Sequence, residues 1–114
     1  MALTFEKCVA CRPGSPEITD LEISDLMPQI PKWRLVQDAG ARKLERQFTF
    51  RDFQKPMELA NRIACASERE GHHPRIIVEW GSLTVSWSTY AIGGLHRNDF
   101  IMASKTDKLF DESH

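Results

Sequence analysis

Two adjacent histidines follow an acidic stretch in the middle of this chain. Residues 68–74 read EREGHHP, and His72 and His73 are two of the four histidines in the sequence. An unperturbed imidazole titrates near pH ~6.5, so a pair of them in a turn can donate and accept protons at neutral pH. Acid/base chemistry is therefore our first hypothesis for this stretch, and a polar helix exit is the structural alternative.

The residues before the pair follow the spacing of an amphipathic helix. Asp52 can cap its start, Pro56 falls in the first turn where a missing amide costs least, and Gly71 is a natural stop. Glu68 lies near the inward edge of the last turn, so its carboxylate can meet His72. The predicted inward-facing residues are Phe53, Met57, Leu59, Ala60, Ile63, Ala64, Ala66 and Ser67.

The remaining apolar spacing predicts two hairpins and two more helices. Thr19 or Asp20 can cap the first helix, and Arg46 interrupts one strand pattern, so we expect a partly buried face or a salt bridge there. Trp33 and Trp87 are expected in the core. An α+β fold, αββαββα, with a four-stranded antiparallel sheet covered on one face by helices, buries every apolar stripe. The predicted elements are a helix to about residue 30, strands 33–38 and 42–50, a helix from about 53 to 70, strands 75–80 and 83–90, and a helix over 97–111.

Length and charge limit the class of protein. The 114 residues suit one domain, and 15 Lys+Arg balance 16 Asp+Glu, which lacks the basic excess typical of nucleic-acid binding. We find neither a secretory signal nor an apolar run long enough to cross a bilayer. We therefore expect a cytoplasmic protein with no nucleic-acid or membrane partner, built as a flexible tail over 1–16 and a single domain over 17–114.

The expected tail contains Cys8-x2-Cys11, a pair with metal-ligand or redox spacing. The cysteines number 3, an odd count that argues against a disulfide framework and fits a reducing compartment. No second cysteine pair follows. We expect a functionally silent pair, because His96 or the His72/His73 pair could complete a metal site only if the tail folded back.

Together, these elements and motifs resemble the pterin-4a-carbinolamine dehydratase family, also known as the dimerization cofactor family of a homeodomain transcription factor. The motif that carries the resemblance is Glu68-x3-His72-His73-Pro74, followed by Trp80, Ser88-Thr89, Gly94-Leu95 and Asp99. The bacterial branch that accompanies phenylalanine hydroxylase is similar at Cys8-x2-Cys11, Ile30-Pro31-x-Trp33 and residues 94–100.

The resemblance implies dehydration of 4a-hydroxytetrahydropterin to quinonoid dihydropterin, with no metal or redox cofactor. A proton leaves a ring nitrogen and hydroxide leaves carbon 4a, so a base and an acid are needed. By this resemblance His72 and His73 supply them, and Glu68 orients His72. The implied substrate-binding residues are Ser88, Thr89, Tyr90, Trp80 and Asp99. The resemblance also implies a homodimer or homotetramer with sheets joined across subunits, and a functional link to phenylalanine hydroxylase.

Tyr90 departs from the family pattern, which usually has a third histidine at this position. With a pKa near ~10, tyrosine can donate a hydrogen bond but is a weak acid at neutral pH. We expect His72 and His73 to suffice. The alternatives are that His96, otherwise expected as a helix cap, swings in to compensate, or that the protein binds pterin with reduced turnover.

Two other classes of function stay open. One branch of the resembled family acts as a coregulator by binding a transcription factor's dimerization helix, so a regulatory module of the same fold is the alternative to an enzyme. The third class is a metal-binding protein that uses His72, His73, Glu70 and the cysteine pair.

Overall fold

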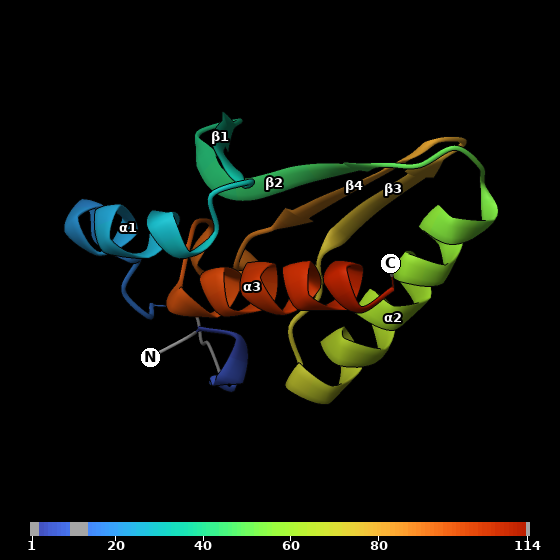
Figure 1. Cartoon of the computed structure of the whole chain (residues 1–114). Helices are drawn as coiled ribbons and strands as arrows, with labels where there is room; N and C mark the ends of the chain where they lie inside the picture. Colours follow the sequence, from blue (N-terminus) through green and yellow to red (C-terminus); the bar gives the residue numbers. More distant parts are fainter. Residues whose placement is uncertain (1–2, 10–13, 114) are drawn as a thin grey trace.

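The computed structural model describes residues 3–9 and 14–113, and within them the elements follow the order αββαββα (Figure 1). The helices are α1 (Asp20–Leu26), α2 (Gln54–Glu70) and α3 (Arg97–Glu112). The strands are β1 (Arg34–Asp38), β2 (Ala41–Thr49), β3 (Arg75–Glu79) and β4 (Ser82–Trp87). The short 3-10 helices are η1 (Leu3–Phe5), η2 (Met27–Gln29) and η3 (Tyr90–Ile92). The predicted α+β fold is confirmed.

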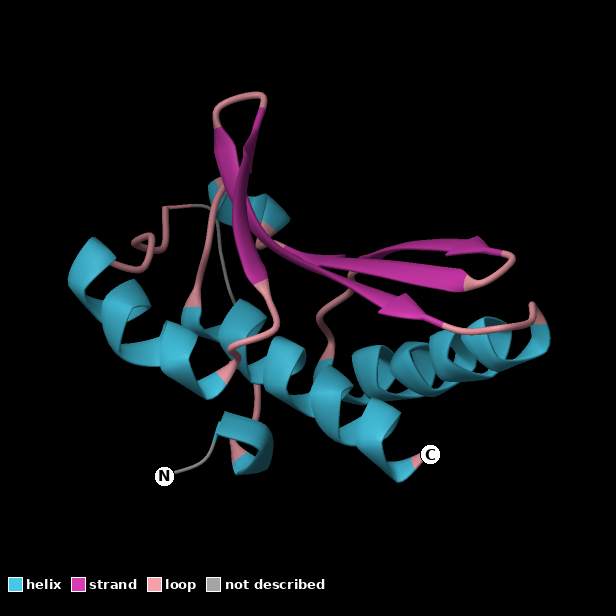
Figure 2. Ribbon diagram, turned by 45° about the horizontal axis from the view of Figure 1, so that its top comes forward, coloured by secondary structure: helices cyan, strands magenta, loops and turns pink. Residues whose placement is uncertain are grey.

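The sheet has the strand order β1-β2-β4-β3, and every pair of neighbours is antiparallel. Figure 2 shows the helices gathered on one side of this twisted sheet. Leu44 lies opposite Trp87 in the register, and Phe48 lies opposite Leu83. These four side chains are buried, and so is Trp33. Trp33 and Trp87 therefore occupy the core, as predicted.

The start of α2 differs from the prediction that Asp52 caps it. The residue before the helix is Phe53, and no side chain caps the first turn. Instead, the carbonyl of Asp52 accepts a hydrogen bond from the amide of Gly81 at 2.9 Å, and the carbonyl of Gly81 accepts one from the amide of Phe50 at 2.9 Å. These bonds hold the chain before α2 against the β3–β4 turn, so the backbone of Asp52 binds the β3–β4 hairpin.

The inward face of α2 is rotated from the predicted one. Phe53 and Met57 are 50% and 39% exposed, so they do not belong to the core. Glu70 continues the spacing of the buried residues, whereas Glu68 points away from it. This rotation decides which carboxylate faces the end of the sheet. The buried residues of α2 are Pro56, Leu59, Ile63, Ala66 and Ser67.

Residues 3–9 fold onto α3 and are not a free tail. The Leu3 side chain is fully buried, and the carbonyl of Thr4 accepts a hydrogen bond from Lys105 Nζ at 2.8 Å. Glu6 forms an ion pair with Arg97 at 2.7 Å. The prediction of a flexible tail is therefore wrong for 3–9, because contacts with distant residues hold this segment. Residues 1–2 and 10–13 of the predicted tail lie outside the described residues.

Arg46 interrupts the strand pattern because it makes a salt bridge within the core layer. Its guanidinium is 2.5 Å from Asp107 Oδ1 and lies 4.2 Å from the ring centroid of Phe48. Asp107 Oδ1 also accepts a hydrogen bond from Trp33 Nε1 at 2.8 Å. The pair joins β2 to α3, so the expectation of a salt bridge at this position is confirmed.

We predict that Arg46→Ala lowers the free energy of unfolding by about 3 kcal/mol, because it leaves the half-buried Asp107 carboxylate without its cation. Arg34→Ala is the matched control. It removes an arginine whose side chain is 74% exposed, and its exposed ion pair with Glu45 is worth at most about 1 kcal/mol. Urea unfolding followed by circular dichroism measures both, and equal stability of the two variants would contradict the prediction.

Candidate active site

The C-terminal end of α2 turns His72 toward the sheet. Gly71 has φ 67°, a left-handed conformation that glycine adopts without a Cβ penalty. The amides of Gly71 and His72 both donate to the carbonyl of Ser67. The chain therefore reverses at this point, and the His72 ring stacks on Trp87 with centroids 5.5 Å apart and 22° between the planes. A core tryptophan thus fixes the plane of the imidazole.

The His72 ring contacts a buried carboxylate. Its Nε2 is 2.6 Å from Asp99 Oδ1, and the Asp99 side chain is fully buried. In the neutral imidazole, an Nε2–H that donates to Asp99 leaves Nδ1 as the free acceptor. The His72 side chain is only 12% exposed, so this pair has a limited opening to solvent. The arrangement orients a base, as a second-layer carboxylate does in other acid/base sites.

Asp99 is satisfied by donors from three different parts of the chain. In addition to His72, its Oδ2 accepts hydrogen bonds from Thr89 Oγ1 at 2.7 Å and from the amide of His96 at 3.0 Å. The side chain of His96 caps α3 in return, because its Nδ1 accepts a hydrogen bond from the amide of Asn98 at 3.1 Å. The predicted capping role of His96 is confirmed, and its Nδ1 is already occupied.

His73 lies in a different environment from its neighbour. Its Nε2 contacts Glu68 Oε2, and the two side chains are 60% and 77% exposed. Glu68 therefore pairs with His73, and the prediction that it orients His72 is wrong. The physical reason is the rotated face of α2, which turns Glu68 outward while Asp99 from α3 takes the place beside His72.

The two histidines open onto one pocket of about 470 Å³. This volume falls within the range of ~300–1,000 Å³ that small-molecule sites usually have. Four segments line it: residues 8–9, the end of α2 with its turn at 70–73, residues 88–91 after β4, and Asn98 on α3. The pocket is therefore built where the ends of two helices and one strand meet.

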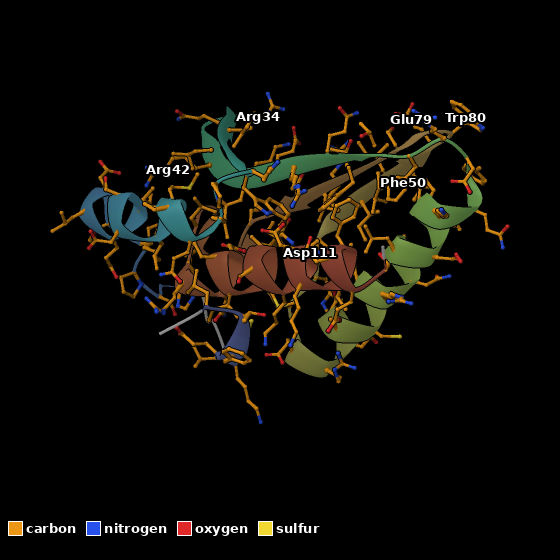
Figure 3. All side chains as sticks on the ribbon, in the orientation of Figure 1. Arg34, Arg42, Phe50, Glu79, Trp80 and Asp111 are labelled. Atoms are coloured by element: carbon orange, nitrogen blue, oxygen red, sulfur yellow. The ribbon has the colours of Figure 1, made fainter. Side chains whose placement is uncertain are left out.

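Three of the residues predicted to bind substrate line this pocket, namely Ser88, Thr89 and Tyr90. Asp99 is buried and does not line the pocket, but it contacts His72, which does. Trp80 lies elsewhere, because it is 72% exposed in the β3–β4 turn, at the opposite end of β3 from His73. Figure 3 shows it beside Glu79 at that end of the sheet. Trp80 is therefore not among the residues that the structure brings together.

Four residues that line the pocket were not predicted to bind substrate: Cys8, Val9, Glu70 and Asn98. Cys8 and Glu70 entered the sequence analysis as ligands of the metal-binding alternative. Glu70 could have been found from the spacing Ile63, Ser67, Glu70, had the correct face of α2 been chosen. Asn98 is adjacent to the motif residue Asp99. Cys8 and Val9 carry no local signal, because their partners lie 62 to 90 residues away in the chain.

Cys8 is half-buried beside the carboxylate of Glu70, and its pKa is accordingly high. Burial first, and then the negative charge of Glu70, raise the pKa of the Cys8 thiol to about 12. A thiol with this pKa stays protonated at neutral pH, so it is a poor nucleophile. Within the described residues no three His, Cys, Asp or Glu side chains gather as a metal site, and Cys11 lies outside them.

The fold and the pocket define a small α+β protein that presents two carboxylate-paired histidines to one small-molecule site. Residues 16–109 match the family model described as pterin 4 alpha carbinolamine dehydratase. The chain therefore belongs to this family of hydro-lyases. In the described part of the chain, no helix is long and apolar enough to cross a membrane.

Bacterial relatives extend this match over nearly the whole chain. The protein from Gloeobacter violaceus named "Putative pterin-4-alpha-carbinolamine dehydratase 1" is 52% identical over 109 residues, which cover 96% of this chain and 94% of that one. Two further relatives are named "Putative pterin-4-alpha-carbinolamine dehydratase". The one from Marinobacter nauticus is 46% identical, and the alignment covers 92% of this chain and 95% of that one. The one from Chlorobaculum tepidum is 48% identical, and the alignment covers 94% of this chain and 96% of that one. Because the first alignment spans 109 of 114 residues, it includes Cys8 and Val9.

A solved structure shares the fold. The crystal structure of a "transcriptional coactivator/pterin dehydratase" from Brucella melitensis superposes with a TM-score of 0.74 and covers 82% of this chain and 98% of that one. Its sequence is 22% identical, so the likeness concerns the architecture alone.

We predict that neutral His72 carries its proton on Nε2, because that nitrogen faces the carboxylate of Asp99. Long-range proton–nitrogen correlation spectra of labelled protein at about pH 8 would identify the tautomer. His96 is an internal control that should also be protonated on Nε2, since its Nδ1 accepts from the amide of Asn98. An Nδ1–H tautomer of His72 would contradict the geometry described above.

Proposed function

We propose that this chain dehydrates 4a-hydroxytetrahydropterin to quinonoid dihydropterin by histidine acid/base catalysis. Membership of the family supports the substrate class. The observation that carries the mechanism is the buried pair of His72 and Asp99 beside the exposed pair of His73 and Glu68. The two pairs provide two proton-transfer groups on the same pocket, which the reaction needs.

In this mechanism His72 is the base. Its Nδ1 takes the proton from the ring nitrogen next to carbon 4a, while Nε2–H stays bound to Asp99. The carboxylate of Asp99 stabilises the imidazolium that forms, since the two are 2.6 Å apart in a buried setting. The electron pair of the broken N–H bond becomes the new double bond between nitrogen and carbon 4a.

His73 is the acid in the same step. As the double bond forms, the bond between carbon 4a and its hydroxyl oxygen breaks, and the imidazolium of His73 gives its proton to that oxygen to release water. Glu68 Oε2 contacts Nε2 of His73 and so orients the ring of the proposed acid. Solvent then returns one proton to His73 and accepts one from His72, so the site is reset without a cofactor.

Ser88 and Thr89, which follow β4, are proposed to bind the pterin. Both line the pocket, and the hydroxyl of Thr89 is already committed to Asp99. Their backbone groups are therefore better candidates than the Thr89 side chain for contacts with the pterin ring. This assignment follows the role that the resemblance gave to the two residues.

Tyr90 is proposed to lie at the rim without a share in proton transfer. Its side chain is 99% exposed on η3, and so it does not point into the interior of the site. His96, the other candidate for a third histidine, has its Nδ1 bound to the backbone of α3. These observations support our reading that His72 and His73 suffice.

The biological setting is proposed from the same family resemblance. Aromatic amino-acid hydroxylation produces the carbinolamine, so we place the chain in tetrahydropterin recycling with phenylalanine hydroxylase, in the cytoplasm. A homodimer or homotetramer with joined sheets remains our prediction for the assembly. Its physical basis is that β1 and β3 are the edge strands of the sheet, and an unpaired edge favours pairing with a second copy.

The decisive assay generates the carbinolamine with a hydroxylase and follows its ultraviolet decay with and without this protein. We predict a clear acceleration, and that His72→Ala lowers kcat by about 10²–10⁴-fold, the usual contribution of a positioned proton-transfer group. Trp80→Ala is the control, because it truncates a large side chain outside the pocket, and its kcat should stay near the wild-type value. No acceleration by the wild-type protein would refute the proposed function.

We further predict that Tyr90→His leaves the turnover similar or raises it. The exposed Tyr90 side chain makes no contact on which the His72–Asp99 pair depends, while a histidine there would add a third proton-transfer group. The same decay assay measures this. A large loss of activity in Tyr90→His would show that the tyrosine has a role of its own.

A further inference from the structure

The segment 3–9, here called the N-terminal segment, continues from its contacts with α3 into the active-site pocket. Figure 1 shows η1 on the side of α3 that faces away from the sheet, and from there the chain runs to the start of α3. Cys8 and Val9 then line the pocket together with the turn that carries His72 and His73. The match to the family model begins at residue 16, so this part of the pocket lies outside it.

Two side chains hold Cys8 and Val9 in place. The side-chain amide of Asn98 binds both backbone groups of Val9: its Oδ1 accepts from the Val9 amide at 3.0 Å, and its Nδ2 donates to the Val9 carbonyl at 2.7 Å. Glu70 Oε1 accepts from the amide of Cys8 at 2.8 Å. Asn98 is 2% exposed, so its bonds are made in a setting where a lost partner is costly.

The residues that hold the segment are close in sequence to the proton-transfer groups. Asn98 precedes Asp99, and Glu70 lies just before the turn to His72. The end of α2 and the start of α3 therefore hold the N-terminal segment and the His72–Asp99 pair in a fixed relative position.

The segment brings an apolar side chain to a pocket whose other lining residues are mostly polar. Val9 is 61% exposed, although two hydrogen bonds to Asn98 hold its backbone and a third, from the amide of Cys8 to Glu70, holds its neighbour. The Cys8 thiol beside it is uncharged, with its pKa raised to about 12 by burial and by Glu70. An uncharged, partly apolar surface can contact the face of a flat heterocycle, while polar atoms of the pocket bind the polar groups at its edge.

We propose that Cys8 and Val9 form a wall of the pocket that contacts the bound pterin, and that Glu70 and Asn98 are the positioning residues of this wall. This inference rests on the proposed function, since it concerns how the same substrate is bound. Proton transfer belongs to His72 and His73, so the wall acts on substrate affinity and leaves the chemical step unchanged.

The first test compares two exposed apolar residues of the same segment. Val9→Ala should raise KM for the carbinolamine by about five- to tenfold, the effect of losing two buried methyl groups, and should change kcat less than about twofold. Phe5→Ala is the matched control, because Phe5 is 73% exposed but does not line the pocket. An unchanged KM in Val9→Ala, or an equal rise in Phe5→Ala, would overturn the proposal.

The second test separates positioning from direct contact by Glu70. Glu70→Ala should raise KM, whereas Glu70→Gln should restore it, because glutamine keeps an oxygen that can accept from the Cys8 amide. If Glu70 acts through the wall, Glu70→Ala combined with Val9→Ala should raise KM by less than the product of the two single effects. Independent, fully multiplicative effects would contradict the positioning role.

The third test measures binding without turnover. Equilibrium titration with 7,8-dihydropterin should give a Kd about five- to tenfold higher for Val9→Ala than for wild type, because the ligand loses contact with two methyl groups. Phe5→Ala, whose changed side chain is exposed and does not line the pocket, should bind like wild type. A wild-type protein that accelerates dehydration while Val9→Ala binds the dihydropterin as tightly as wild type would overturn the proposed wall, whereas a wild-type protein that neither accelerates nor binds would overturn the proposed function itself.

Discussion

The buried carboxylate of Asp99 is the interaction on which the rest of the site depends. A fully buried carboxylate is stable only when donors replace the water it has lost. Here the donors are the ring of His72, the hydroxyl of Thr89 and the amide of His96, which come from the end of α2, the end of β4 and the start of α3. One side chain therefore fixes the meeting point of three elements, and the pocket lies beside it.

This constraint gives two adjacent histidines different surroundings. His72 is turned inward by Gly71, stacked on Trp87 and paired with Asp99, whereas His73 stays exposed and paired with Glu68. Two identical side chains in one pocket can then take opposite roles, because one is oriented as a base and the other stays open to solvent. Our proposal that His72 acts as the base and His73 as the acid rests on this difference in surroundings.

The local patterns predicted much of this arrangement. The order of elements, the core tryptophans and the His96 cap could be read from spacing, because each depends on residues close together in the chain. The partner of Glu68 could not be predicted from the sequence. Helix α2 carries apolar residues on two overlapping faces, and only packing against α3 and the sheet selects one of them. The fold of residues 3–9 was beyond the sequence for a similar reason, because Val9 and Asn98 meet only in the folded chain.

We propose that Asp99 makes His72 an effective base, and the rate of carbinolamine decay in Asp99→Asn measures this effect. Asparagine keeps the size of the side chain and an oxygen that can accept from Thr89 or His96, but it carries no charge to stabilise an imidazolium. We expect kcat to fall by about 10²-fold or more, while circular dichroism shows that the fold is retained. A folded Asp99→Asn protein that turns over at the wild-type rate would contradict it.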